Sequence, residues 1–149
     1  MIGIERLREV MHENLTAYVE RQRWSGTPEG GIDAIEPDWV EVLGDDPLLV
    51  WMVVRASLPG GDDQRYQLFL GARPAAPWPE FLEGKDREIL AVVPDPESDG
   101  EVVVYDALVD PDLAVDVLHL VAPDQEVEVR RPIVLEHSNS SVVFEPWPL

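Results

Sequence analysis

The apolar residues at the start of the chain recur at spacings of three and four from Gly3 to about Gln22. This period predicts an amphipathic helix whose apolar stripe faces a core. The stripe consists of Ile4, Leu7, Met11, Leu15, Tyr18 and Val19. The opposite side mixes acidic residues with arginines, which is typical of a solvated face with local ion pairs. Pro28 follows Gly26, so we expect the helix to end near Ser25 and Gly26.

A series of β-branched and aromatic runs follows, and turn residues separate them. The strand candidates are 32–35 and 39–43, interrupted at Pro37, then 48–58, 65–73, 89–93 and 101–105, with shorter ones at 127–129, 133–135 and 141–144. Short loops between the first runs favour an antiparallel meander. Residues 74–84 contain three prolines, and we expect a surface loop with at most one helical turn there.

A second helix is predicted after Asp110. Pro111 fits the first helical position, and the acidic groups of Asp110 and Asp112 suit a helix N-terminus. The apolar residues that follow again repeat at helical spacing, and Pro123 is expected to end the helix. The order of helix, antiparallel strands, helix and further strands predicts an α+β fold in one domain.

Composition supports one folded domain. The chain has 149 residues, about the commonest domain size. Its 30 Asp and Glu against 11 Lys and Arg give a net charge of −19, yet 45% of its residues are hydrophobic and five are Trp, enough apolar surface to fold. Such a charge should repel nucleic acids and anionic membranes. No Lys or Arg lies between Arg87 and Arg130, so we expect one acidic face for a basic protein partner.

The chain contains no Cys, which excludes disulfides and thiolate zinc sites. Its N-terminus has a charge every few residues and no apolar targeting segment, and no run is apolar enough to span a membrane. These features predict a cytoplasmic protein.

Catalytic and metal-binding motifs are weak. Residues 95–106 superficially match a calcium loop, but predicted strands flank them, and their Pro, Asp, Ser and Gly are what a hairpin turn needs. The histidines His12, His119 and His137 lack metal-ligand spacing, and each is expected either at the surface or with its hydrogen bonds satisfied within the protein. Lys85 is the only lysine, and the chain has neither a phosphate-binding loop nor a nucleophile elbow. We therefore expect no enzyme activity, no metal and no cofactor.

Two segments have a composition that is unusual for a scaffold, and each has two interpretations. Arg21, Arg23 and Trp24 could form a cation–π or carboxylate-binding corner, or the indole could pack under the sheet while the arginines pair with local acids. The polar run Ser138, Asn139, Ser140 and Ser141 could bind an anion through hydroxyls and backbone N–H groups, or it could be a turn.

Together these segments resemble the maltokinase family, actinobacterial sugar kinases of the trehalose-to-glycogen route. The resemblance rests on RQRWSG at 21–26, EHSNSSVVF at 136–144 and the YDAL-x-DP stretch at 105–111. It covers the family's N-terminal cap across 1–149, with 136–149 resembling the first loop of the kinase N-lobe. Ser25 and Thr27 stand where the family has Phe and Lys, which puts a cap contact there in doubt.

The resemblance implies a cystatin-like topology, a curved antiparallel sheet packed on the N-terminal helix with a second helix. In the family, a nucleotide-binding Lys follows the segment matched by Ser138–Val143, whereas this chain reaches its last residue first. Two prolines in 145–149 break the final strand as a natural terminus would, so we expect a free-standing cap-like protein. Phosphoryl transfer also needs metal-binding acids and a catalytic Asp from the missing lobe.

Three functions follow as hypotheses. The first is a non-catalytic, protein-binding or regulatory partner of a sugar kinase or another enzyme of maltose, trehalose or glycogen metabolism. The second is a binding module for a small ligand, either a sugar or a nucleotide. The third is an acidic mimic of nucleic acid.

Overall fold

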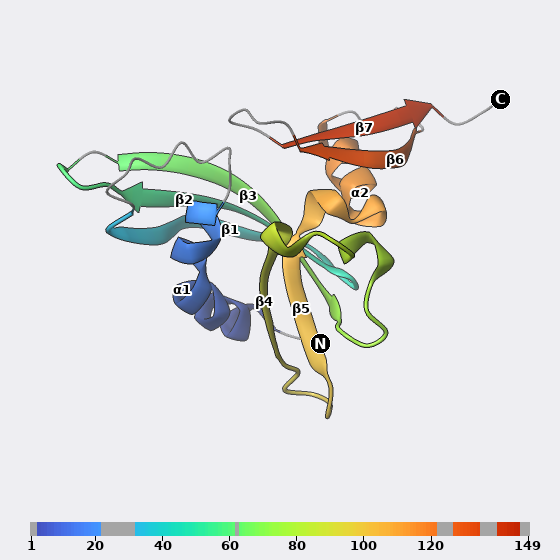
Figure 1. Ribbon diagram of the computed structural model, residues 1–149, viewed down its shortest axis with the longest axis horizontal. Coiled ribbons are helices and arrows are strands. Elements are labelled where there is room, and N and C mark those ends of the chain that lie inside the picture. Colours follow the sequence, from blue (N-terminus) through green and yellow to red (C-terminus); the bar gives the residue numbers. More distant parts are fainter. Residues whose placement is uncertain (1–2, 22–31, 62, 122–126, 135–139, 147–149) are drawn as a thin grey trace.

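A computed structural model describes residues 3–21, 32–61, 63–121, 127–134 and 140–146, with side chains for 3–20, 32–61 and 63–120 (Figure 1). The helices are α1 (Ile4–Arg21) and α2 (Pro111–Val121), and the strands are β1 (Ala34–Asp45), β2 (Leu48–Ser57), β3 (Asp63–Pro74), β4 (Ile89–Pro94), β5 (Glu101–Asp106), β6 (Val127–Val134) and β7 (Ser140–Pro146). Short 3₁₀ turns occupy Glu80–Leu82, Asp86–Glu88 and Ala107–Val109. The predicted α+β fold is confirmed.

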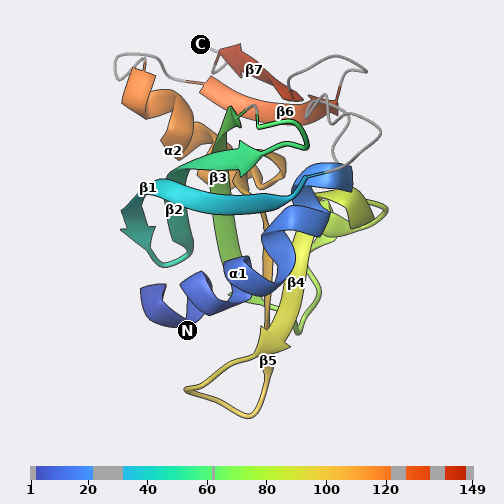
Figure 2. The ribbon, with the colours of Figure 1, turned by 90° about the vertical axis from the view of Figure 1, so that its left-hand side faces the viewer.

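The first five strands form one open antiparallel sheet in the order β1-β2-β3-β5-β4. The meander expected for β1, β2 and β3 is therefore confirmed, and so is the β4–β5 hairpin. β6 and β7 form a separate antiparallel pair. Figure 2 shows α1 on one side of the sheet and α2 with the β6–β7 hairpin on the other.

Helix α1 covers one face of the sheet because its apolar stripe is continuous. The stripe buries Leu7, Val10, Met11, Leu15, Tyr18 and Val19, each at most 1% exposed. On the sheet, Val50, Met52 and Val54 of β2 point to the same core. A buried side chain of this size contributes about 1.5–3 kcal/mol, so the helix gains on the order of 10 kcal/mol from this contact.

A second core lies on the opposite face of the sheet. Strand β5 serves both cores, since Val102 and Val104 join the first whereas Val103 and Tyr105 join the second. This alternation follows from the two-residue period of a strand. Leu113 from α2 completes the second core together with Leu49, Leu82, Ala107 and Val109.

Strand β1 is an edge strand and runs through Pro37 without a break. The predicted interruption at Pro37 is wrong, because a register shift between Pro37 and Trp39 absorbs the proline, and a second shift follows between Val42 and Gly44. Proline has no N–H to donate, and an edge strand with a bulge is one of the few places in a sheet that accept it. The two strands predicted at 127–129 and 133–135 are likewise one strand, β6, with a register shift between Val129 and Arg131.

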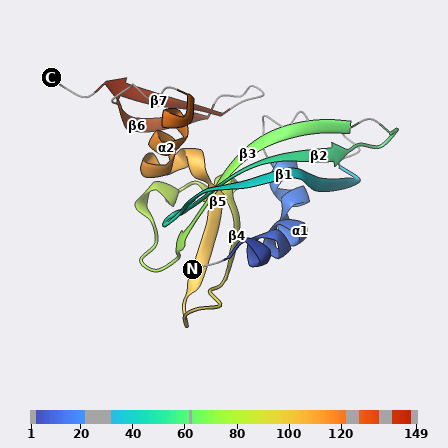
Figure 3. The ribbon, with the colours of Figure 1, turned by 180° about the vertical axis from the view of Figure 1, so that it is seen from behind.

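The expectation of one acidic face is wrong for the described residues. Asp106 and Asp110 are buried. The acidic β4–β5 turn and helix α2 lie at opposite ends of the molecule (Figure 1, Figure 3). No described helix is both long and apolar enough to cross a membrane.

Candidate functional site

The segments singled out in the sequence lie at the border of the described structure. Arg21 is the last residue of α1, and Ser140 and Ser141 begin β7, but their side chains are outside the described part. Arg23 and Trp24 lie outside the described residues altogether. Ser138 and Asn139 do too. The binding roles suggested for these residues therefore stay predictions.

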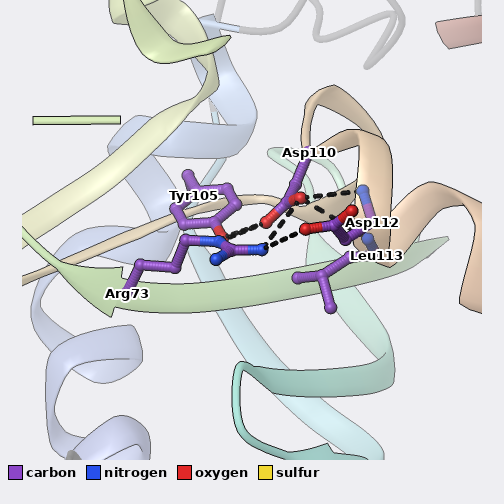
Figure 4. Close-up of polar contacts among 5 residues, drawn as sticks. All are labelled: Arg73, Tyr105, Asp110, Asp112 and Leu113. Carbon is purple, nitrogen blue, oxygen red and sulfur yellow. Dashed lines mark hydrogen bonds and ion pairs between the residues drawn. The ribbon is translucent and has the colours of Figure 1, made fainter. Parts of the chain in front are cut away.

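The most connected polar group lies where α2 meets the sheet (Figure 4). We call Arg73, Tyr105, Asp110 and Asp112 the Asp110 cluster. Arg73 near the end of β3 donates from Nε to Asp110 Oδ2 at 2.7 Å and from a terminal nitrogen to Asp110 Oδ1 at 3.2 Å. The Tyr105 hydroxyl donates to Asp110 Oδ2 at 2.6 Å. A two-bond ion pair of this kind fixes direction as well as distance.

Asp110 is also the N-cap of α2, as its position before Pro111 predicts. Its Oδ1 accepts the backbone N–H of Asp112 at 3.0 Å and that of Leu113 at 3.5 Å. These groups have no acceptor within the helix, so the cap satisfies donors that would otherwise be buried unpaired. One carboxylate thus joins the helix start to strands β3 and β5.

The electrostatics of the cluster reflect this connectivity. Burial, reinforced by the hydrogen bond to Asp110, raises the pKa of Tyr105. Burial alone would lower the pKa of Arg73, but its bond to Asp110 and the charge of that carboxylate raise it overall. Both groups therefore keep their protons at physiological pH. The Arg73 guanidinium also lies 5.7 Å from the ring centre of Phe81, within the range of a cation–π contact.

The Asp110 cluster is consequently a structural joint. The Tyr105 hydroxyl and both carboxylates are bonded within the cluster, and Asp110 itself is 0% exposed, whereas Asp112 lies at the surface. The sequence predicted the N-cap role of Asp110. It did not predict the ion pair between Asp110 and Arg73, because alternation assigns a residue to a face of the sheet but does not identify a partner elsewhere in the chain.

A second feature is an exposed aromatic surface on the side of the sheet away from α1. We call Trp39, Trp51 and Val53 the tryptophan face. Trp39 pairs with Val53 in the β1–β2 ladder, and the rings of Trp39 and Trp51 lie 6.5 Å apart at 59°. Trp39 is 54% exposed. The Trp51 indole N–H is buried and has no hydrogen-bond acceptor within the described structure.

Charged pairs border the tryptophan face along the sheet. Asp38 lies 3.3 Å from Arg65 and 3.9 Å from Arg55, and Glu36 lies 3.6 Å from Arg55. An apolar centre with a charged border is the usual anatomy of a protein-binding surface. Neither tryptophan was singled out in the sequence, where both read as strand residues.

The 95–106 segment begins with a tight turn. Asp95 accepts the Glu97 N–H at 2.9 Å and the Ser98 hydroxyl at 3.1 Å, which is the local bonding of a tight turn. The backbone bond to Glu97 and the Ser98 hydroxyl lower the pKa of Asp95. Among the described residues, no group of three or more metal-binding side chains could hold an ion. His12 and His119 are surface residues, and His137 lies outside the described residues.

The comparisons with known proteins agree with the resemblance seen in the sequence. No curated protein matches the chain. The model of one family, described as the maltokinase N-terminal cap domain, matches residues 18–110. This range begins in α1, contains the whole five-stranded sheet and ends at the cap of α2. Since the match covers more than half of the sequence, the chain belongs to the maltokinase N-terminal cap family.

Proposed function

We propose that the chain is a non-catalytic cap module that acts by contact with an enzyme of maltose, trehalose or glycogen metabolism, in the first place a sugar kinase. The family description supports this direction, because it names a cap at the N-terminus of maltokinases. The proposal includes a single cap-like domain over 1–149, with 136–149 as the beginning of a kinase-lobe loop, and a cytoplasmic location.

The exposure of Trp39 carries the proposal. An indole that is 54% exposed on a sheet leaves apolar surface in water, and large exposed aromatic residues with polar borders are typical of binding surfaces. Tryptophan is also among the residues that most often dominate the energy of a protein interface. The adjacent indole N–H of Trp51, which is buried and has no acceptor among the described residues, is a further feature that the fold itself does not explain.

The Asp110 cluster supports the non-catalytic part of the proposal. Its charged groups are bound to one another and to the start of α2. Catalysis needs a base or nucleophile that can reach a substrate, and Asp110 has no exposed surface. The cluster is therefore suited to hold the cap in one shape.

The contact is tested by affinity purification. The 149-residue chain is immobilised and incubated at low salt with extract of its own cells, and retained proteins are identified by mass spectrometry. A sugar kinase or another enzyme of the named pathways should be retained by the wild-type chain and lost with Trp39→Ala. Trp78→Ala is the matched control, because Trp78 is a 41% exposed indole in the loop after β3.

The outcomes separate the parts of the proposal. Failure of the wild-type chain to retain any such enzyme overturns the proposed function. Retention by Trp39→Ala assigns the contact elsewhere, and the predicted corner of Arg21, Arg23 and Trp24 is then the next surface to mutate. Formation of a sugar phosphate by the purified chain with ATP, Mg²⁺ and maltose contradicts the non-catalytic role.

A further inference from the structure

A groove lies between helix α1 and the first part of edge strand β1. It encloses about 360 Å³, within the size range of small-molecule sites. Figure 2 and Figure 3 show α1 beside β1. The groove is lined by Arg8, Met11, His12, Leu15 and Thr16 from the helix and by Ala34, Ile35, Glu36 and Pro37 from the strand.

Two side chains on the helix wall of this groove are hydrogen-bond donors. Arg8 and His12 are one helical turn apart, so their side chains share a face of α1. Within the described residues, neither side chain forms a hydrogen bond or an ion pair. By contrast, the neighbouring Arg6 pairs with Glu9 at 2.9 Å. In a chain with 30 acidic and 11 basic residues, an arginine without an acidic partner beside a groove is available to an external anion.

The floor of the groove is apolar. Met11 and Leu15 are each 1% exposed and belong to the first core, while Ile35 packs against the same core from the strand side. Met11 and Leu15 thus expose almost no surface, so an apolar ligand body leaves water mainly against the half-buried Ile35 and the exposed Pro37. The Thr16 hydroxyl, one turn beyond His12, can both donate and accept a hydrogen bond.

The strand wall is largely apolar on the side that faces the helix. Ile35 pairs with Ala56 and Pro37 pairs with Val54, and both partners belong to the first core, so Ile35 and Pro37 lie on the α1 side of the sheet. Glu36 also lines the groove, but it pairs with Arg55, and its carboxylate lies 3.6 Å from the Arg55 guanidinium on the side of the tryptophan face. The strand therefore turns apolar side chains, and not the Glu36 carboxylate, toward Arg8 and His12.

We infer that the groove between α1 and β1 binds a small organic acid with an apolar body. The acid group accepts hydrogen bonds from Arg8 and His12, and the apolar body lies against Ile35 and Pro37. This site is on the α1 side of the sheet, whereas the tryptophan face is on the other side. The inference therefore goes beyond the proposed protein contact and is independent of it.

Benzoate is a suitable probe for this groove. Its binding to the 149-residue chain is followed by NMR titration, and saturable shifts are expected for the side-chain signals of Arg8 and His12. Arg8→Gln should weaken binding by about tenfold or more, the loss expected for a hydrogen bond to a charged group. Arg6→Gln is the matched control, since Arg6 has the same charge but does not line the groove, and its affinity should change by less than about twofold, as a screened surface charge does.

Benzyl alcohol tests whether the charge of the ligand is needed. It has a similar apolar body without the charge and should bind at least about tenfold more weakly than benzoate, because it lacks the charge-assisted bond.

The inference is overturned if benzoate gives no saturable shift with the wild-type chain. Equal losses in Arg8→Gln and Arg6→Gln overturn it as well, because they would indicate general attraction to positive charge. Binding of benzyl alcohol as tight as that of benzoate contradicts the assigned role of the acid group. Thermal unfolding of each variant shows whether the fold is intact. Arg8→Gln should still retain the partner enzyme in the affinity experiment. Loss of benzoate binding in this variant therefore tests the groove without testing the tryptophan face.

Discussion

Gly71 of β3 and Leu113 of α2 meet so closely that a β-carbon on Gly71 would lie 2.5 Å from Leu113 Cδ1. The same atom would lie 3.0 Å from Cε2 of Tyr105. Gly71 is needed here for close approach, because any side chain would occupy the space that Leu113 fills in the second core. The contact lies two residues from Arg73, so the apolar and polar joints between α2 and the sheet are adjacent.

Gly71→Ala should destabilise the protein by about 1–3 kcal/mol, the usual cost of adding volume to a packed core. Leu113 and Tyr105 are both buried, so neither can move aside into solvent. The free energy of unfolding in urea measures the effect. Gly44→Ala is the control, because a β-carbon there meets nothing nearer than 3.8 Å, and its change should stay within about 0.5 kcal/mol.

A double-mutant cycle tests whether Leu113 is the residue responsible. Leu113→Ala alone should cost about 2–5 kcal/mol through cavity formation. In Gly71→Ala/Leu113→Ala the new methyl group enters the space left by leucine, so the combined cost should fall below the sum by about 0.5–3 kcal/mol. Additive costs would show that the two residues do not interact.

Arg73→Ala should be strongly destabilising, by about 3–5 kcal/mol, because it leaves the carboxylate of Asp110 buried without its cation. Asp112 is bonded by the same guanidinium at 3.2 Å but its side chain is 82% exposed. Asp112→Ala should therefore cost no more than about 1 kcal/mol. Urea unfolding of the two variants measures the contrast, and equal losses would contradict the structural role of Asp110.

Stability should depend on the ionisation of Asp106. Burial, with a smaller contribution from the charge of Glu88, raises its pKa from 3.8 to about 6. A carboxyl whose pKa is raised by folding binds its proton more tightly in the native state. The stability that it contributes is present below pH 3.8 and is lost as the pH rises to about 6.

Asp106→Asn should remove this dependence. The amide oxygen can still accept the Leu108 N–H, which Asp106 binds at 3.0 Å. The variant should therefore be more stable than the wild type at pH 7, by up to about 2–3 kcal/mol, and its stability should change less between pH 4 and 6. Asp99→Asn removes an exposed carboxylate and is the control. A wild-type profile that rises across this pH range would contradict the prediction.

Trp39→Ala should weaken binding of the partner enzyme, once that enzyme is purified, by about 2 kcal/mol or more if Trp39 is a central contact. Calorimetry with the wild-type chain, Trp39→Ala and Trp78→Ala measures it. Both tryptophans are partly exposed. If the loss of affinity came from removing any exposed indole, the two variants should lose the same affinity. Equal affinities would place the contact away from the tryptophan face.

Periodicity predicted the elements that face a single core. The stripe of α1 points to the first core as expected, and alternate residues of β3, namely Tyr66, Leu68 and Leu70, point to the same core. The apolar run of β2 has less alternation because both faces of this strand carry apolar side chains. Val50 joins the first core, Leu49 joins the second, and Trp51 lies on the tryptophan face. The sequence of β2 therefore predicted a strand but did not predict which of its faces is exposed to solvent.

Proline positions explain the errors in strand boundaries. Pro37 and Pro132 both predict interruptions, yet each lies inside a continuous strand near a register shift. The shift changes the local pairing so that a missing N–H is tolerated. Whether a strand bends around proline or ends there depends on the neighbouring strand, and a single sequence does not contain that information.

The candidate sites were less predictable than the fold. The N-cap role of Asp110 has a local signal, because the donors that it satisfies follow it directly. Its pairing with Arg73 crosses from α2 to β3 and has none. Arg8 and His12 read as part of a solvated face, and only the position of β1 beside them forms a groove. Sites made by tertiary contact thus appeared only with the folded chain.

The irregular edge of β1 has a consequence for behaviour in concentrated solution. A regular free edge offers an incoming strand a continuous row of donors and acceptors. Pro37 removes one donor, and the two register shifts interrupt the spacing of the others. Charged residues such as Glu36 and Asp38 add repulsion between two negatively charged molecules. The edge therefore resists strand-to-strand aggregation, and this protection leaves the adjoining tryptophan face free for a different kind of contact.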